Sequence, residues 1–213
     1  ALTSANSINI ARLYPQTIYY FNTVAQLLKS NQEITFCVPS GNFGNLTAGL
    51  IAKKMGLNAN FIAATNANDI VDRYLKSGLY EPKPSIKTLS NAMDVGNPSN
   101  FPRILELFSG DEELLKKTLK SSSCSDQKTI ETIKDCYFNN NYLLDPHGAV
   151  GMHVWKKHCQ QYENPGLGVI LGTAHPAKFL EVVEQAIGKT IDLPKELSCL
   201  VNKEKHKYPL DRE

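Results

Sequence analysis

The sequence predicts an α/β fold, a three-layer arrangement of a parallel sheet with flanking helices. Three short segments, 34–38, 60–64 and 168–171, are apolar and rich in β-branched residues, as buried strands are. Segments with helical periodicity separate them, and strands that alternate with helices pair in parallel through right-handed crossovers. The 213 residues suffice for a large domain with a packed core.

A long helix is expected ahead of the first strand. Within 6–29, apolar side chains recur at steps of three and four residues, which predicts a helix with one buried face. These positions are Ile10, Leu13, Tyr14, Thr17, Ile18, Phe21, Val24, Ala25 and Leu28. A second helix is expected over 44–56, where Gly56 ends it, and a third over 68–77.

The middle and the end of the chain have weaker patterns. Prolines and polar residues crowd 80–100, which predicts a loop and the segment best able to move. The serine-rich run 121–125 is interpreted as a flexible joint. The sequence beyond 190 is charged, so 191–213 is expected to be a surface tail. Further helices are expected near 101–108, 111–120, 126–139 and 147–162, and from His175 onward.

Composition excludes several classes of function. Lys and Arg number 23 against 21 Asp and Glu, and they are dispersed along the chain, which argues against a nucleic-acid partner. No apolar stretch reaches the ~20 residues that cross a bilayer, and the first residues have no secretory pattern. Five cysteines form no C-x-x-C pair, so no metal site is expected, and reduced thiols indicate the cytoplasm.

The turn after the first strand predicts an anion-binding loop. Pro39 ends the strand, and Gly41 and Gly44 allow the backbone to approach a ligand closely. The helix that follows presents unpaired N–H groups and the positive end of its dipole, so 40–45 could hold a phosphate without a lysine. The G-x-x-G spacing matches neither the dinucleotide fingerprint nor the P-loop.

A purely structural alternative exists for this turn. Ser40, Asn42 and Asn45 are residue types that cap helices, and the two glycines could serve only to make the turn. In a parallel α/β sheet, ligands bind at the carboxyl ends of the strands, where both Ser40 and Thr65 are expected. The two turns are therefore expected to face one pocket.

Six segments in order resemble threonine synthase, over nearly all of the chain up to about Glu184. The most specific are NSINIARL at 6–13, VPSGNFGNLTAGLIAKKMGL at 38–57 and LGTAHPAKF at 171–179. They are joined by FIAATNANDIVDRYLKSG at 61–78, TLSNAMDVGNPSNFPRILELF at 88–108 and LLDPHGAVG at 143–151. The resemblance implies a fold-type II pyridoxal-phosphate enzyme, similar to the tryptophan synthase β chain. On this basis, 1–190 is expected to be the C-terminal part of the large cofactor-binding domain, with a helical insertion near 100–141.

The resemblance also implies a reaction and a cofactor site. Threonine synthases convert O-phospho-L-homoserine and water to L-threonine and phosphate with pyridoxal 5'-phosphate. By the family's motifs, the cofactor phosphate is held by Ser40, Gly41, Asn42, Phe43, Gly44 and Asn45. Thr173 is placed near the pyridine nitrogen, where a neutral hydroxyl favours elimination and replacement over transamination. From the residue alone, Thr173 would be interpreted as a helix cap.

The segment at 6–13 is the candidate substrate site. A guanidinium matches a phosphate or carboxylate, so Arg12 is expected to bind the substrate, with Asn6, Ser7 and Asn9 as uncharged partners. The alternative is that the three polar residues cap a helix and Arg12 is solvated. His147 is interpreted as part of a helix start, and Lys178 as a solvated residue.

The Schiff-base lysine of the family is not expected in this chain. In threonine synthases it lies upstream in a Phe-Lys-Asp segment, which this sequence does not contain. We therefore expect no catalytic residue here, an inactive isolated chain, and the upstream half of the enzyme as a partner. The competing interpretations are a self-sufficient cofactor-binding or regulatory module and a structural remnant.

Overall fold

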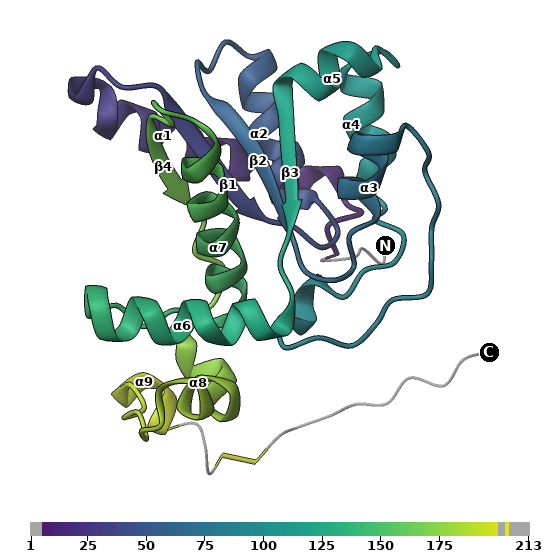
Figure 1. Cartoon of the computed structure of the whole chain (residues 1–213). Helices are drawn as coiled ribbons and strands as arrows, with labels where there is room; N and C mark the ends of the chain where they lie inside the picture. The colour runs from purple at the N-terminus through teal and green to yellow at the C-terminus, as the bar shows by residue number, and fades with distance from the viewer. Residues whose placement is uncertain (1–5, 200–202, 205–213) are drawn as a thin grey trace.

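The computed structural model describes residues 6–199, 203 and 204, and its centre is a parallel sheet of four strands (Figure 1). The strand order is β3-β2-β1-β4. The strands are β1 Ile34–Pro39, β2 Asn60–Thr65, β3 Leu119–Ser123 and β4 Leu167–Ile170. In the described part of the chain, β3 and β4 are thus the two edges. The predicted fold class is confirmed.

Alternate side chains of β1 and β2 enter two separate cores. Phe36 and Phe61 pack with helices α1 (Leu13–Leu27) and α2 (Gly44–Lys54) on one face. Cys37 and Ile62 pack with Val154 of helix α7 (Pro146–Gln161) on the other. Because successive strand residues point to opposite faces, burial on both sides explains why these strands are continuously apolar.

An aromatic cluster fixes α1 and α2 against the sheet. The ring of Tyr20 lies 4.8 Å from that of Phe36 and 5.7 Å from that of Phe61, measured between centroids. Gly49 of α2 faces the same rings, and a Cβ there would be 2.5 Å from Phe61 Cε1. The absence of a side chain at Gly49 therefore lets α2 lie close to the sheet.

The first helix is only partly as predicted. It begins with a short 3-10 turn, η1 (Ile10–Arg12), and ends with another, η2 (Leu28–Ser30). Its buried face carries Leu13, Thr17 and Tyr20. Phe21, Ala25 and Leu28, which were expected on that face, are exposed. So are Ile10, Tyr14 and Ile18, which were expected there too. These three lie four residues apart and form an exposed apolar stripe along one side of the helix.

The prediction of a flexible joint at 121–125 is wrong. Residues 119–123 form β3, in register with β2 such that Leu119 lies opposite Phe61 and Ser123 opposite Thr65. Leu119 is buried, and the hydroxyl of Ser121 donates to Asp72 Oδ1 at 2.7 Å. Serine has a weak strand preference, and an edge strand pairs on one side only, so the local pattern does not reveal it. The segment 100–141 therefore contributes to the sheet and is not a purely helical insertion.

The remaining helices surround the sheet and extend below it in Figure 1, where α6 and α8 pack together. They are α3 Ile70–Ser77, α4 Phe101–Leu107, α5 Glu112–Thr118, α6 Asp126–Asn140, α8 Leu180–Ile187 and α9 Lys195–Ser198, with 3-10 turns η3 Asn91–Met93 and η4 Pro176–Phe179. The tail expected at 191–213 contains α9, and 200–202 and 205–213 lie outside the described residues. Within the described ranges, no helix is both long and apolar enough to cross a membrane.

Candidate functional site

The loop that follows β1 lies beside the end of β2, as expected. Ser40 is buried, its N–H donates to the carbonyl of Ala64 at 2.8 Å, and its hydroxyl donates to the carbonyl of Val38 at 2.8 Å. Both bonds fix the point where the chain leaves the sheet. The turns after β1 and β2 therefore meet at the carboxyl edge, which is where ligands bind in parallel sheets.

The start of α2 is a helix N-terminus with no side-chain cap. Phe43 occupies the cap position and offers no side-chain acceptor, and the first helical bond runs from Thr47 N–H to Phe43 O at 2.9 Å. The N–H groups of Gly44, Asn45 and Leu46 precede that bond and have no partner within the helix. Three donors and the positive end of the helix dipole thus converge on the loop, which is the arrangement that binds phosphate.

The capping alternative for this turn is wrong, because the two asparagine side chains are engaged elsewhere. Asn42 Nδ2 donates to the hydroxyl of Ser7 at 2.7 Å, and its Oδ1 accepts from the N–H of Ser99 at 2.7 Å. Asn45 Oδ1 accepts from the hydroxyl of Tyr20 at 2.6 Å. These side chains brace the loop and leave the start of α2 without a side-chain cap.

Phe43 holds the loop in an unusual backbone conformation. Its φ is 62° and its ψ is 14°, in the left-handed region that residues with a side chain rarely adopt. Its ring is buried and lies 6.3 Å from that of Phe101 of α4. Such a backbone state costs on the order of 1–3 kcal/mol and persists only where the surroundings impose it. Burial of the ring against α4 is the interaction that imposes it here.

Gly41 lies directly against the short turn η3. A Cβ at Gly41 would be 2.5 Å from Met93 Cα and 3.1 Å from Ala92 O, so no larger residue fits without displacing that backbone. The segment around η3, more than forty residues later in the chain, therefore packs directly against the loop. No local sequence pattern predicts this contact.

A buried polar network anchors the segment that contains η3. Asn66, at the end of β2, is 1% exposed, and its Nδ2 donates to Thr88 Oγ1 at 2.8 Å and to Asp94 Oδ1 at 2.9 Å. Thr88 Oγ1 in turn donates to Asp94 Oδ1 at 2.6 Å. The expectation that 80–100 is the part best able to move is therefore wrong for 88–94, which is tied to β2 by charge-assisted hydrogen bonds.

The candidate substrate residues meet the loop through Ser7. Its hydroxyl accepts the bond from Asn42 described above, which places Ser7 beside the predicted anion-binding loop 40–45, called the cradle below. Asn6 Oδ1 accepts from Ile8 N–H at 3.1 Å, and Asn9 Oδ1 accepts from Ala11 N–H at 3.1 Å and so caps η1. Arg12 is exposed at the start of α1. The structure thus supports local capping for Asn9 and contact with the loop for Ser7.

Arg103 of α4 is a positioning residue that the sequence did not indicate. Its guanidinium donates to the carbonyls of Ser7 at 3.3 Å and Ile8 at 2.5 Å, and to Asn100 Oδ1 at 2.6 Å. Asn100 in turn donates to the carbonyl of Asn42 at 2.9 Å. One arginine therefore connects the N-terminal segment to the cradle across more than ninety residues of chain, a distance over which no local pattern is informative.

Thr173 follows β4, the strand beside β1. Ile170 pairs with Cys37, so Thr173 and Ser40 both lie three residues beyond that pair, at the same edge of the sheet. The threonine is exposed. Its interpretation as a helix cap is wrong, because His175 caps η4 with Nδ1 accepting from Ala177 N–H at 3.1 Å. Lys178 is exposed, as expected.

Asp145 and His147 form a buried pair at the start of α7. The carboxylate of Asp145 accepts from the N–H groups of His147 at 2.9 Å and Gly148 at 3.2 Å, and from His147 Nδ1 at 2.8 Å. The predicted cap at this helix start is confirmed, with Asp145 as the capping residue. Among the described residues, no group of His, Cys, Asp and Glu could hold a metal ion.

Comparisons with known proteins agree with this geometry. A family model described as "Threonine synthase, C-terminal" matches residues 148–213. Threonine synthase from Haemophilus influenzae is 51% identical over 198 residues, which are 92% of this chain and 45% of that protein. The chain matches the C-terminal half of threonine synthases. The crystal structure of threonine synthase from Escherichia coli superposes with a TM-score of 0.84 at 48% identity, covering 92% of this chain and 45% of that one.

This chain is also similar to a threonine synthase whose structure was solved with its cofactor. The threonine synthase of Brucella melitensis, solved with PLP bound, superposes with a TM-score of 0.87 at 34% identity, over 96% of this chain and 49% of that one. The family resemblance expected from the six segments is confirmed, and with it the fold-type II assignment. The chain spans about half the length of the curated threonine synthases it matches.

Proposed function

We propose that this chain supplies the cofactor-phosphate cradle of a threonine synthase, which converts O-phospho-L-homoserine and water to L-threonine and phosphate. The observation that carries the proposal is the uncapped N-terminus of α2, with three N–H groups free of intrahelical partners at the carboxyl edge of the sheet. The 51% identity to a threonine synthase supports the reaction assignment. In the proposed enzyme, pyridoxal 5'-phosphate is bound with its phosphate on residues 40–45.

Each residue of the cradle has a distinct proposed role. Gly44 and Asn45 donate backbone N–H groups to the cofactor phosphate, and the dipole of α2 stabilises its charge. Gly41 and Phe43 shape the backbone, and Asn42 fastens it to Ser7 and Ser99. Ser40 fixes the exit from β1. When bound, the cofactor supplies the electron-withdrawing ring on which this class of chemistry depends.

Thr173 and the N-terminal segment complete the proposed pocket. A neutral hydroxyl at Thr173 would leave the pyridine nitrogen of the cofactor largely unprotonated, which favours replacement chemistry over transamination. Arg12 and the polar residues Asn6, Ser7 and Asn9 are proposed to bind the anionic substrate. The bond from Asn42 to Ser7 supports this, because it holds the segment next to the cradle.

The isolated chain is proposed to be inactive and to act with the upstream half of the same enzyme. No residue of this chain is assigned as the Schiff-base lysine, which the family carries in its other half. The exposed apolar stripe of Ile10, Tyr14 and Ile18 supports a missing partner, because soluble proteins rarely leave such a surface uncovered. Residues 1–190 would then be the C-terminal part of the large cofactor-binding domain. The free cysteines of the described chain fit a reducing cytoplasm.

Complementation tests the proposal directly. The upstream half of a threonine synthase, expressed separately and mixed with this chain and pyridoxal 5'-phosphate, should release phosphate from O-phospho-L-homoserine and form threonine. Each half alone should be inactive. The chain alone should form no borohydride-reducible adduct on a single lysine. A stoichiometric adduct, or threonine formed by this chain alone, would show that it carries its own Schiff-base lysine and would overturn the proposal.

A further inference from the structure

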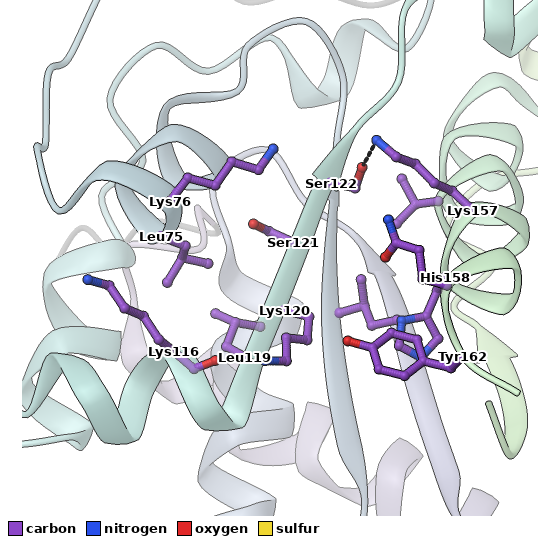
Figure 2. A pocket seen from close by; sticks show the side chains of 13 residues that line it. Leu75, Lys76, Lys116, Leu119, Lys120, Ser121, Ser122, Lys157, His158 and Tyr162 are labelled. Atoms are coloured by element: carbon purple, nitrogen blue, oxygen red, sulfur yellow. Dashed lines mark hydrogen bonds between the residues drawn. The ribbon is translucent and has the colours of Figure 1, made fainter. Parts of the chain in front are cut away.

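A cavity lies along the edge strand β3, away from the cradle. It has a volume of about 360 Å³ and is lined by residues of α3, α5, β3 and α7 (Figure 2). Leu119 and Val154 form part of its floor. It lies along the body of the strand, whereas the cradle lies at the carboxyl ends of β1 and β2, so the two sites share no residue.

Four lysines line this cavity. Figure 2 shows Lys76 and Lys116 on one side of β3 and Lys157 on the other, with Lys120 extending from the strand between them. They come from four different elements, which the fold brings together. A ligand can contact the lysines on both sides of β3 at once only if it extends across this strand.

Two of the four positive charges are balanced by nearby carboxylates. Lys76 Nζ lies 2.6 Å from Asp72 Oδ2, and Lys116 Nζ lies 3.3 Å from Glu112 Oε2. Asp72 is itself buried and also accepts from Ser121. These pairs hold the walls of the cavity in place.

The other two charges are not balanced in the described part of the chain. Lys157 Nζ donates to the hydroxyl of Ser122 at 3.0 Å, and Lys120 Nζ donates to the carbonyl of Lys116 at 3.3 Å. Neither lysine forms an ion pair with any carboxylate among residues 6–199, 203 and 204. Both partners are neutral oxygen atoms, so the positive charges of Lys157, on one side of β3, and of Lys120, on the strand itself, remain uncompensated.

The imidazole of His158, in the wall of the cavity, is affected by the same positive charge. Burial, and after it the charge of Lys120, lower the pKa of His158. Its ring lies 4.5 Å from that of Tyr162, and both line the cavity. An anion in the cavity would therefore stabilise the protonated imidazole and raise its pKa.

We propose that this cavity binds a small ligand that carries at least two phosphate groups. Lysine ammonium groups bind phosphate oxygens as point charges, and hydroxyl donors such as Ser122 and Tyr162 add directed bonds. One phosphate can contact only one side of the strand, whereas linked phosphates can reach Lys157 and the Lys76–Lys116 side together. The inference rests on this cavity alone and does not depend on the function proposed for the cradle.

Inorganic pyrophosphate, without added metal, is the probe. With ¹⁵N-labelled full chain, pyrophosphate should shift the amide signals of residues 119–122 and 157–158 saturably, and the pKa of His158 measured by NMR should rise. Orthophosphate should bind at least about tenfold more weakly, as measured by the same amide shifts, because it reaches only one side of β3. Shifts at the cradle, residues 40–46, are recorded separately, so binding there is not mistaken for binding here.

The matched variants are two double substitutions that remove the same charge. Lys120→Gln with Lys157→Gln should weaken pyrophosphate binding at β3 at least about tenfold. Lys29→Gln with Lys134→Gln, both exposed and on other elements, should leave it unchanged. The proposal is overturned if pyrophosphate does not shift the β3 amides of the parent, or if both double variants weaken binding equally. The lysines would then be charges that only prevent the edge strand from pairing with another chain.

Discussion

The hydroxyl of Tyr20, on α1, bonds two oxygen atoms of Asn45 at the start of α2: the side-chain oxygen at 2.6 Å and the carbonyl at 2.9 Å. This relationship connects the aromatic core directly to the cradle. The ring of Tyr20 packs on Phe36 and Phe61, so the packing of the core sets where the hydroxyl lies.

Tyr20→Phe should therefore weaken both the fold and the cradle. The ring contacts remain, whereas one buried hydroxyl and its bonds are lost, so the free energy of unfolding should fall by about 1 kcal/mol. Urea unfolding measures this change. Pyridoxal 5'-phosphate should also bind less tightly, because Asn45 loses its brace. An unchanged denaturation midpoint would show that the bonds to Asn45 contribute nothing to the fold.

Asn45→Asp tests the charge of the cradle without changing its shape. Aspartate keeps an oxygen to accept from Tyr20, and a negative charge in the first turn suits the helix dipole, so the fold should remain stable. The same charge should repel the cofactor phosphate and weaken binding of pyridoxal 5'-phosphate at least about tenfold.

The control for that charge is Asn58→Asp, an exposed site in the loop between α2 and β2. It makes the same charge change just before β2, at the edge of the sheet opposite the cradle. Cofactor binding should therefore stay unchanged. Binding is measured by equilibrium titration of each purified variant. If both variants bind as the parent does, the N-terminus of α2 does not hold the phosphate.

Gly41→Ala should destabilise the protein through a clash. The added Cβ would lie 2.5 Å from Met93 Cα, and relief requires η3 or the loop to move, at a cost of about 1–3 kcal/mol. Gly172→Ala is the control, since a Cβ there meets nothing within 4 Å. Thermal unfolding of the two variants should differ clearly. A Gly41→Ala protein as stable as the Gly172→Ala protein would contradict the close contact with η3.

Stability should fall in alkali because of Cys37. Burial raises the pKa of its thiol to about 12, above the value of about 8.5 for an exposed thiol. Because the pKa is higher in the folded state, the thiol stabilises the fold fully at pH values below the unfolded-state pKa. This stabilisation is lost as pH rises from about 8.5 toward 12, and the free energy of unfolding then falls by up to about 1.4 kcal/mol per pH unit.

Cys37→Ala should flatten this part of the pH profile, whatever it does to stability at pH 7. Cys199→Ala, at an exposed thiol, should keep the slope of the parent. The measurement is the free energy of unfolding by urea between pH 8 and pH 10.5. Parallel profiles for the parent and Cys37→Ala would remove the buried thiol as the cause.

The sequence predicted those parts of the fold that depend on local pattern. The strands around Phe36 and Phe61 are apolar because both of their faces are covered, whereas the edge strand around Val169 was predicted correctly but is only half-buried. The glycine-rich turn lies where the strand-turn-helix pattern places it. The strand at Leu119–Ser123 was missed, because a serine run at a sheet edge has no such pattern.

The supports of the site could not be predicted for a different reason. Arg103 reaches Ile8, and Asn66 reaches Asp94, through contacts that exist only after folding. The asparagines of the loop have the composition of helix caps, yet their partners lie on α1 and near α4, so local chemistry suggested the wrong role. The sequence pattern located the turn before α2, whereas the residues that brace this turn are known only from tertiary packing.

The exposed stripe that runs from η1 onto α1, formed by Ile10, Tyr14 and Ile18, affects how much of this chain a cell keeps. Chaperones and proteases act on chains with uncovered apolar surface, and a loss of about 1–2 kcal/mol in stability can change protein abundance several-fold. We expect the amount of this chain to follow the supply of whatever covers the stripe. If a separate polypeptide covers the stripe, as the proposed function requires, the rate at which that polypeptide is produced would set the amount of this chain.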